Sequence, residues 1–309
     1  QEALWHFAEH RVITVAARLG MLGLLAARAA DAAEVSRELG LDPLATRKML
    51  DALAACGLLE HHQGRFRLNA ELAPLFQPGP ADLAAFIQHS HQMYERWGAT
   101  LESWVRGEEM PRRGPPDPAR FGAAMQAIGS HAARDLADGF DVGDARTLLD
   151  VGGGFGQYSR ALLERAPGLS ATVVDTEAVV ELGREAARDL GDRIAFIGGD
   201  YHEVDYGGPH DLVLMANVLH QERPDAAARL VQRGARVLAP GGRLAVLDFK
   251  IDPGHHTERL GALFAINMRS FGDTYSAQQI GGWLQQAGLE QVERLDISPH
   301  RWVISGRAS

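Results

Sequence analysis

The chain has 309 residues, of which 46% are hydrophobic and 23% charged, and its formal net charge is −9. The length predicts two domains, and the composition is typical of a globular protein rather than a disordered or membrane chain. The negative charge repels phosphate backbones, so we expect no nucleic-acid partner. The apolar stretches are shorter than the ~20 residues that span a membrane, so we also expect no membrane partner and a cytoplasmic location.

The sequence begins with helical patterns. Apolar residues recur at three- and four-residue intervals over 5–27, which predicts a helix with breaks near Gly20 and Gly23. Two further helices are predicted over 31–39 and 43–55, each bounded by capping residues and glycine. The cysteine that follows, Cys56, is the only one in the chain, so no intramolecular disulfide can form, and we expect its side chain in the core.

A predicted β-hairpin comes next. Apolar residues alternate over 58–68 around the turn pair Gln63-Gly64. Helix, turn, helix and hairpin together predict a winged helix. A long amphipathic helix is expected over 82–106, a breaker-rich connector over 111–118 and another helix over 119–139.

The remaining sequence alternates between strand and helix patterns, which predicts a mostly parallel sheet covered by helices on both faces. The strand candidates are Thr147–Val151, Ala171–Val174, Ile194–Gly198, Asp211–Ala216, Arg243–Phe249, Gln291–Ile297 and Trp302–Ser305. The last two are joined by only four residues, so they must pair antiparallel. The sequence therefore predicts an α/β fold, a doubly wound seven-stranded sheet of the methyltransferase variant with an antiparallel last strand.

A glycine-rich turn follows the first of these strands. The segment 148–156 runs from a strand into three consecutive glycines and then Gly156, where a helix begins. Such glycines let a ligand approach the backbone at a helix N-terminus. The next strand ends at Asp175, about 20 residues on, where a carboxylate can accept hydrogen bonds from ribose hydroxyls. Gln157 replaces the third glycine of a dinucleotide motif, which argues against a nicotinamide cofactor.

Further segments match a known family. They are Tyr94-Glu95-Arg96-Trp97, Asp150-Val151-Gly152-Gly153-Gly154-Phe155-Gly156, Asn217-Val218-Leu219-His220 and Leu238-Ala239-Pro240-Gly241-Gly242. With these segments the chain resembles, over nearly its whole length, the S-adenosylmethionine-dependent O-methyltransferases of the plant caffeate/flavonoid type and their bacterial natural-product relatives.

The resemblance implies S-adenosylmethionine as the methyl donor, S-adenosylhomocysteine as its product, and no metal. The implied donor-binding residues are Asp150, Gly152, Gly154, Asp175, Asp200, Tyr201 and Asn217. Among them, Asp175 is expected at the ribose and the Asp200-Tyr201 pair beside the adenine. His89 and His91 are two residues apart and do not share a helix face, so they make a poor metal pair.

A general base is needed if the acceptor atom is a hydroxyl oxygen, and histidine suits this task near neutral pH. His220 lies just past the carboxyl end of the strand 211–216, where ligands of such sheets bind. The resemblance implies that His220 is this base and that two carboxylates orient it. Asp248 matches the first, and Asp273 is the candidate for the second.

The acceptor is expected to be a small aromatic or polyketide-type molecule in an apolar pocket. The predicted pocket residues are Met93, Trp97, Phe121, Met125, Met268 and Phe271, each of which could instead be an ordinary core residue. Transfer to nitrogen, sulfur or carbon, or another reaction on the same fold, remains open at this point because fold does not determine function.

The resemblance also predicts a domain organisation. Residues 1–110 would form a winged-helix dimerisation and substrate-lid domain, 111–140 a helical connector, and 141–309 the donor-binding catalytic domain. The apolar first helix would leave an exposed patch in a monomer, so we expect a homodimer. The rival hypothesis, a winged-helix DNA-binding regulator, is disfavoured because this domain lacks a basic stripe.

Overall fold

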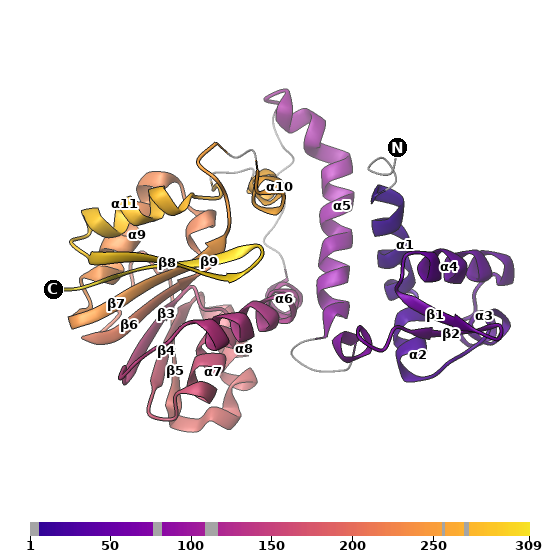
Figure 1. Ribbon diagram of the computed structural model, residues 1–309, viewed down its shortest axis with the longest axis horizontal. Helices are drawn as coiled ribbons and strands as arrows, with labels where there is room; N and C mark the ends of the chain where they lie inside the picture. Colours follow the sequence, from indigo (N-terminus) through magenta and orange to yellow (C-terminus); the bar gives the residue numbers. More distant parts are fainter. Residues whose placement is uncertain (1–5, 77–81, 109–116, 255–256, 269–271) are drawn as a thin grey trace. The chain divides into compact units, whose positions relative to one another are not determined.

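The computed structural model of the chain describes most of its residues (Figure 1). The described ranges are 6–76, 82–108, 117–254, 257–268 and 272–309. The predicted pocket residue Phe271 lies outside them. Contacts divide the chain into two compact units, Gln1–Ile128 and Gly129–Ser309. The expected three-part division at 110 and 140 stays a prediction.

The first unit begins with two helices, α1 (His6–Arg18) and α2 (Met21–Ala27). They are separated at Gly20, whose φ of 82° lies in the left-handed region that favours glycine. The second predicted break, at Gly23, is wrong, because this glycine lies inside α2. A single glycine lowers helix propensity only modestly, and the buried side chains of α2 compensate for it.

Across the described ranges, no single helix is long and apolar enough to cross a membrane. Taken together, α1 and α2 pass the same test of length and composition, but they are bent by 69° at the break between them.

The predicted helices and hairpin of this unit are confirmed. The helices are α3 (Ala32–Leu39) and α4 (Pro43–Ala55), and β1 (Leu59–His62) pairs antiparallel with β2 (Arg65–Leu68). Gln63 and Gly64 both have positive φ, as a two-residue hairpin turn of the favoured twist requires. The assignment of these elements as a winged helix stays a prediction.

Cys56 corrects one expectation about the core, because its side chain is exposed. It is the C-cap residue of α4, and the last buried residue of that helix is Leu53. The first unit continues with the short 3₁₀ turn η2 (Ala73–Phe76) and the helix α5 (Leu83–Val105), and it ends within α6 (Pro118–Gly139).

The second unit contains a seven-stranded sheet in the order β5-β4-β3-β6-β7-β9-β8. The strands are β3 (Thr147–Val151), β4 (Ser170–Asp175), β5 (Ile194–Gly198), β6 (His210–Ala216), β7 (Leu238–Phe249), β8 (Glu290–Ser298) and β9 (Arg301–Arg307). The first five pair in parallel, and β9 is antiparallel to both β7 and β8. The predicted fold class is therefore confirmed.

One strand is longer than the sequence pattern indicates. β7 begins at Leu238, whereas alternation predicted a start at Arg243. Leu238 already pairs with His210, and the pairing then shifts before Leu212 meets Arg243. The intervening proline and glycines interrupt the apolar pattern, which is why the first pair is invisible in the sequence.

Helices cover both faces of this sheet (Figure 1). They are α7 (Gln157–Arg165) and α8 (Glu177–Ala186) on one face and α9 (Pro224–Ala235) and α11 (Ala277–Gln286) on the other. Shorter elements complete the unit: η3 (Arg188–Arg193), η4 (Leu219–Gln221) and α10 (Arg259–Asn267).

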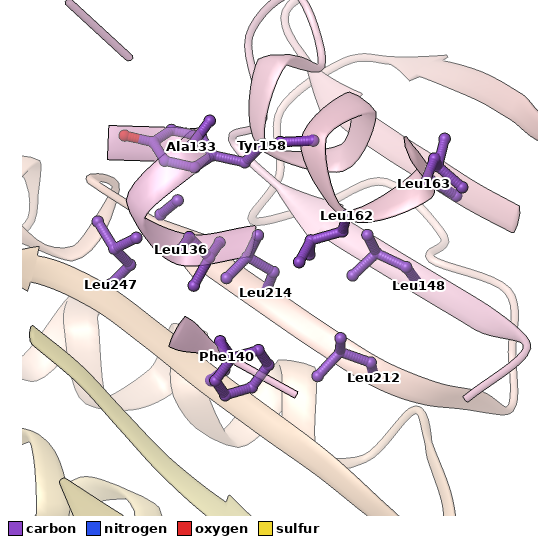
Figure 2. Packing of buried hydrophobic residues seen from close by; sticks show 14 of the residues in the cluster. Ala133, Leu136, Phe140, Leu148, Tyr158, Leu162, Leu163, Leu212, Leu214 and Leu247 are labelled. Atoms are coloured by element: carbon purple, nitrogen blue, oxygen red, sulfur yellow. The ribbon is translucent and has the colours of Figure 1, made fainter. Parts of the chain in front are cut away.

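The face of the sheet towards α7 is closed by a buried apolar cluster (Figure 2). Leu136 and Phe140 of α6 and Tyr158 and Leu162 of α7 share this cluster with leucines of β3, β6 and β7. Close packing of this kind holds the helices against the sheet, and the loops that follow the strands lie at the edge formed by the strand ends. Because β3 to β7 are parallel, the segments that follow them emerge together at that edge.

Candidate active site

The glycine-rich turn after β3 has a backbone that only glycine adopts readily. Gly152, Gly154 and Gly156 have φ values of 67°, 60° and 78°. A β-carbon on Gly153 would lie 2.6 Å from the side-chain carbon Cγ of Asp150. Gly156 caps α7 without a side-chain hydrogen bond, so the first amides of that helix have no cap from this residue. The turn therefore fits a polar ligand that approaches the backbone closely.

Asp175, at the end of β4, is tied to this turn. Its Oδ2 accepts a hydrogen bond from the amide of Gly154 at 2.9 Å, and its Oδ1 accepts one from the amide of Thr176 at 2.7 Å. Desolvation by burial raises the pKa of this carboxyl, and the two amide bonds oppose the rise. The side chain is half-buried, so part of the carboxylate remains accessible for hydroxyl donors.

Asp150 differs from Asp175, because it is fully buried beneath the turn. Its Oδ2 accepts a hydrogen bond from the hydroxyl of Ser159 at 2.7 Å, and its Oδ1 has no partner among the described residues. Desolvation raises the pKa of this carboxyl to about 7. Burial favours the neutral form of this carboxyl, and its side chain packs against the turn.

The segment after β5 carries Asp200 and Tyr201, the pair predicted beside the adenine. Asp200 is exposed, and its Oδ1 accepts a hydrogen bond from the amide of His202. The hydroxyl of Tyr201 donates to Oε1 of Glu222 at 2.7 Å, and burial raises its pKa. Glu222 also contacts Nε2 of His202 at 3.0 Å, so its carboxylate connects the side chains of Tyr201 and His202. No sequence signal singled out Glu222.

His220 and Asp248 form the buried polar pair of the edge. Nδ1 of His220 lies 2.8 Å from Oδ1 of Asp248, and both side chains are almost fully buried. The same Oδ1 accepts the amide of Phe249 at 2.8 Å. Because an ionised carboxylate can only accept, this contact assigns the imidazole proton to Nδ1 and leaves Nε2 as the acceptor.

Aromatic rings pack beside this imidazole. The ring of Phe264 meets the ring of His220 edge-on, with centroids 4.8 Å apart, and packs against Phe249 with centroids 4.1 Å apart and the ring planes tilted by 31°. Sequence reasoning missed both phenylalanines. Their only signal was their place, since Phe249 directly follows Asp248 and Phe264 lies in an apolar helix.

Asp273, the predicted second orienting carboxylate, makes a different contact. Its Oδ1 accepts the amide of Thr274 at 2.8 Å, and the hydrogen bonds of the described residues do not connect it to His220. Its neighbour Gly272 lies against the carbonyl of His220, so close that a β-carbon there would be 1.9 Å from the oxygen. The chain around Asp273 therefore supports the backbone of His220, and the role of its carboxylate stays a prediction.

Asn217 lies in the turn between β6 and His220. Its Nδ2 donates to the hydroxyl of Tyr158 at 2.6 Å, and its Oδ1 accepts a hydrogen bond from Nη1 of Arg301 at 2.6 Å. One residue further on, the side chain of Val218 packs on the glycine-rich turn, because a β-carbon on Gly152 would lie 2.8 Å from Cγ2 of Val218. The turn that carries His220 is thus in direct contact with the glycine-rich turn.

The predicted pocket residues fall in both units. Met93 and Trp97 are half-buried on α5, Met125 is half-buried on α6, and Phe121 is 39% exposed at the start of α6. Met268 is half-buried at the end of α10 in the second unit. Their shared pocket stays a prediction.

Neither of the paired histidines of α5 is part of a metal cluster. The ring of His89 packs edge-on against Phe121 at 5.6 Å, and His91 lies between Arg11 and Arg18. Within the described parts of the chain, no three side chains of His, Cys, Asp or Glu are grouped in a way that could hold a metal ion.

Two family models match the chain. Residues 81–290 match an O-methyltransferase domain, and residues 2–78 match an O-methyltransferase dimerisation domain.

Individual relatives agree with these matches. The 3-hydroxy-5-methyl-1-naphthoate 3-O-methyltransferase of Streptomyces sahachiroi is 30% identical over 91% of this chain and 86% of its own length. The N,N-dimethyltransferase OxyT of Streptomyces rimosus is 27% identical over 96% of this chain and 92% of its own length. Among solved structures, human N-acetylserotonin methyltransferase in complex with SAM has a TM-score of 0.88 at 23% identity, covering 100% of this chain and 96% of that one. The chain belongs to the family of S-adenosylmethionine-dependent O-methyltransferases, as its sequence motifs predicted.

Proposed function

We propose that the protein transfers a methyl group to a hydroxyl of a small aromatic or polyketide-type acceptor, with His220 as the general base. The observation that carries this proposal is the buried His220–Asp248 pair, whose histidine lies on a turn packed directly against the glycine-rich turn. The naphthoate O-methyltransferase that the chain resembles acts on an aromatic hydroxyl, which supports the acceptor class.

S-adenosylmethionine supplies an electrophilic methyl group when it is bound. Gly152 and Gly154 would hold its methionine part through backbone groups, and Asp175 would accept its ribose hydroxyls. Asp200 and Tyr201 would lie beside the adenine. Asp150 and Asn217 support the turns from within the protein, so we assign them an indirect role at this site.

The chain's own residues then move one proton. Nε2 of His220 accepts the proton of the acceptor hydroxyl, and the Asp248 carboxylate holds Nδ1–H and stabilises the imidazolium that forms. The packed rings of Phe249 and Phe264 exclude water from one side of the imidazole, which strengthens the interaction between the two charges.

His220→Ala tests this role. We expect kcat to fall by about 10²- to 10⁴-fold, the contribution of a positioned general base, and the affinity for S-adenosylhomocysteine to change little. Asp248→Asn should lower kcat by a smaller factor, because it changes only the orientation of the imidazole and the charge beside it. The assay uses isotope-labelled donor with a panel of phenols, amines and thiols, followed by mass analysis, and His62→Ala at an exposed hairpin position is the control.

Wild-type turnover in His220→Ala would contradict the base and point to an acceptor that needs none. One relative, OxyT, is an N,N-dimethyltransferase by name. Methylation of an amine in the panel would therefore favour nitrogen as the acceptor atom.

We also propose that residues 1–110 mediate a homodimer and cover the acceptor. The matched dimerisation domain supports this assembly, as do the exposed apolar side chains Phe7, Leu19 and Leu44 of the first unit. Obligate interfaces bury more than ~2,000 Å². Light scattering should therefore show a dimer, and a monomer at micromolar concentration would contradict the assembly.

A further inference from the structure

Arg301 connects the terminal hairpin to the turn that carries His220. It is the first residue of β9 and pairs with Phe249 of β7 across the sheet. Its Nη1 donates to Oδ1 of Asn217 at 2.6 Å, and its guanidinium lies over the ring of Phe249, 4.2 Å from the centroid. One side chain thus makes two contacts at the edge, one polar and one aromatic.

The polar contact is made to a residue whose backbone has a positive φ. Asn217 has a φ of 57°, in the left-handed region that non-glycine residues seldom adopt. Its amide donates to the carbonyl of Leu247 at 2.9 Å, and its own carbonyl accepts Nε2 of Gln221 at 3.2 Å. Both ends of the side-chain amide are also hydrogen-bonded, so these contacts fix the main chain and the side chain of Asn217. The chain then enters η4, where His220 lies.

The other end of this side-chain amide is also fixed. Nδ2 of Asn217 donates to the hydroxyl of Tyr158, whose ring is buried in the apolar cluster of α7 (Figure 2). Burial raises the pKa of this tyrosine, and the nearby charge of Arg301 lowers it. Asn217 is therefore held between a ring that packing immobilises and a guanidinium supplied by the hairpin.

The aromatic contact connects Arg301 to His220 by a second route. Phe249, beneath the guanidinium, packs against the tilted ring of Phe264, and Phe264 meets the imidazole edge-on. Arg301 consequently contacts both groups that position His220, the backbone turn through Asn217 and the aromatic wall through Phe249.

We propose that Arg301 is a positioning residue for His220 and acts through Asn217 and Phe249 without contact with the acceptor. The inference rests on the proposed role of His220 as the base. It assigns to the antiparallel strand pair a part in catalysis: the hairpin supplies the cation that keeps the base-bearing turn in place.

Arg301→Met tests this assignment, because methionine keeps much of the apolar bulk but removes the charge and the donors. We expect kcat to fall by about 10- to 100-fold, the range for a small misplacement of a reacting group. The affinity for S-adenosylhomocysteine, measured by calorimetry, should change by less than about threefold. Arg301→Lys, which keeps a cation and a donor but not the planar stack, should recover part of kcat.

Arg294→Met is the matched control. Arg294 lies on the other strand of the same hairpin, stacks on Trp302 at 4.7 Å and pairs with Asp296, and none of these contacts involves Asn217 or Phe249. Its kcat should remain within about threefold of wild type. An equal loss of kcat in both arginine variants would show a general effect of the hairpin and contradict the proposal.

A double-mutant cycle separates positioning from direct binding. If Arg301 acts through His220, Arg301→Met should lower the residual turnover of His220→Ala by less than about threefold. The same large factor in both backgrounds would mean that Arg301 contacts a substrate, and the proposal would be wrong. Wild-type turnover in His220→Ala is a different result, because it removes the proposed base itself.

Asn217→Gly supplies a second cycle that remains informative if Arg301→Met folds poorly. Glycine adopts the left-handed conformation without the side-chain amide, so this variant should fold and lose kcat. Adding Arg301→Lys to Asn217→Gly should then cost less than Arg301→Lys costs alone. Full additivity of the two changes would overturn the route through Asn217.

Discussion

The glycine-rich turn and the turn that carries His220 are neighbours built by different means. In the first, three glycines with positive φ set the path, and the backbone amide of Gly154 makes the contact with Asp175. In the second, side chains from remote segments, among them Tyr158, Asp248 and Arg301, hold a left-handed asparagine and an imidazole. We therefore expect changes at the first turn or at Asp175 to lower donor affinity, and changes at the second turn to lower turnover.

Asp175→Ala tests the donor side of this comparison and should have the largest effect of the three changes below. We expect the affinity for S-adenosylhomocysteine to fall by about 10- to 150-fold, equivalent to losing ~1.5 to 3 kcal/mol of hydrogen bonding. At saturating donor, kcat should stay near wild type. Calorimetry measures the affinity, with Asp225→Ala, an exposed carboxylate paired with Arg229, as the control. Unchanged affinity, or preferential binding of NAD by the wild type, would contradict the donor site.

Gly272→Ala tests the other side. The added β-carbon would press on the carbonyl of His220, so we expect kcat to fall by about 10- to 100-fold while donor affinity remains. Gly282→Ala is the matched control, since a β-carbon there meets no atom within 4 Å and alanine suits the interior of α11. If donor affinity rather than kcat were lost in Gly272→Ala, the two turns would not be separable in the way proposed.

Asp150→Asn should have the smallest effect of the three on donor affinity and kcat, but it should change the pH dependence of stability. The pKa of Asp150 is raised to about 7 in the folded chain, against about 3.9 in an unfolded one. Between these values the unfolded chain binds fewer protons, so the stability that the neutral carboxyl contributes is present below about pH 4 and lost as the pH rises through 7.

The thermal midpoint of Asp150→Asn relative to wild type should therefore increase from about pH 4 to pH 7 and then level off. Each kcal/mol corresponds to about 2 to 4 °C for a domain of this size. Calorimetric scans of both proteins across this range measure the difference, and Asp205→Asn at an exposed position serves as the control. A constant difference between pH 4 and 7 would contradict the buried neutral carboxyl.

The same contrast explains what the sequence could predict. Apolar runs of strand length predicted all seven strands of the sheet, and the glycines after β3 predicted a turn that a ligand can approach closely. These signals are local. In the structure, three of these glycines have positive φ. His220 was found from its place just past the carboxyl end of β6 and from the family resemblance, which also implied Asp248, and the structure places the two side chains 2.8 Å apart.

The rest of the site depends on contacts between segments far apart in the chain. Arg301 lies 84 residues from Asn217, and nothing in its local pattern distinguishes it from a surface arginine. Glu222 and Phe264 reach the site because the loop and the helix that contain them pack there, so their local sequence did not identify them. Asp273 was predicted from its position in the sequence alone. In the structure its carboxylate accepts the amide of Thr274, and it is the neighbouring Gly272 that lies against the carbonyl of His220.

The exposed Cys56 gives the protein a single chemical handle. Because it is the only cysteine in 309 residues and lies at the end of α4, a thiol-reactive probe would label each chain once, in the first unit. In a homodimer, two spin labels would then report one inter-subunit distance without any engineered mutation. The same label could follow, in one preparation, whether adding donor or acceptor changes the arrangement of the two subunits.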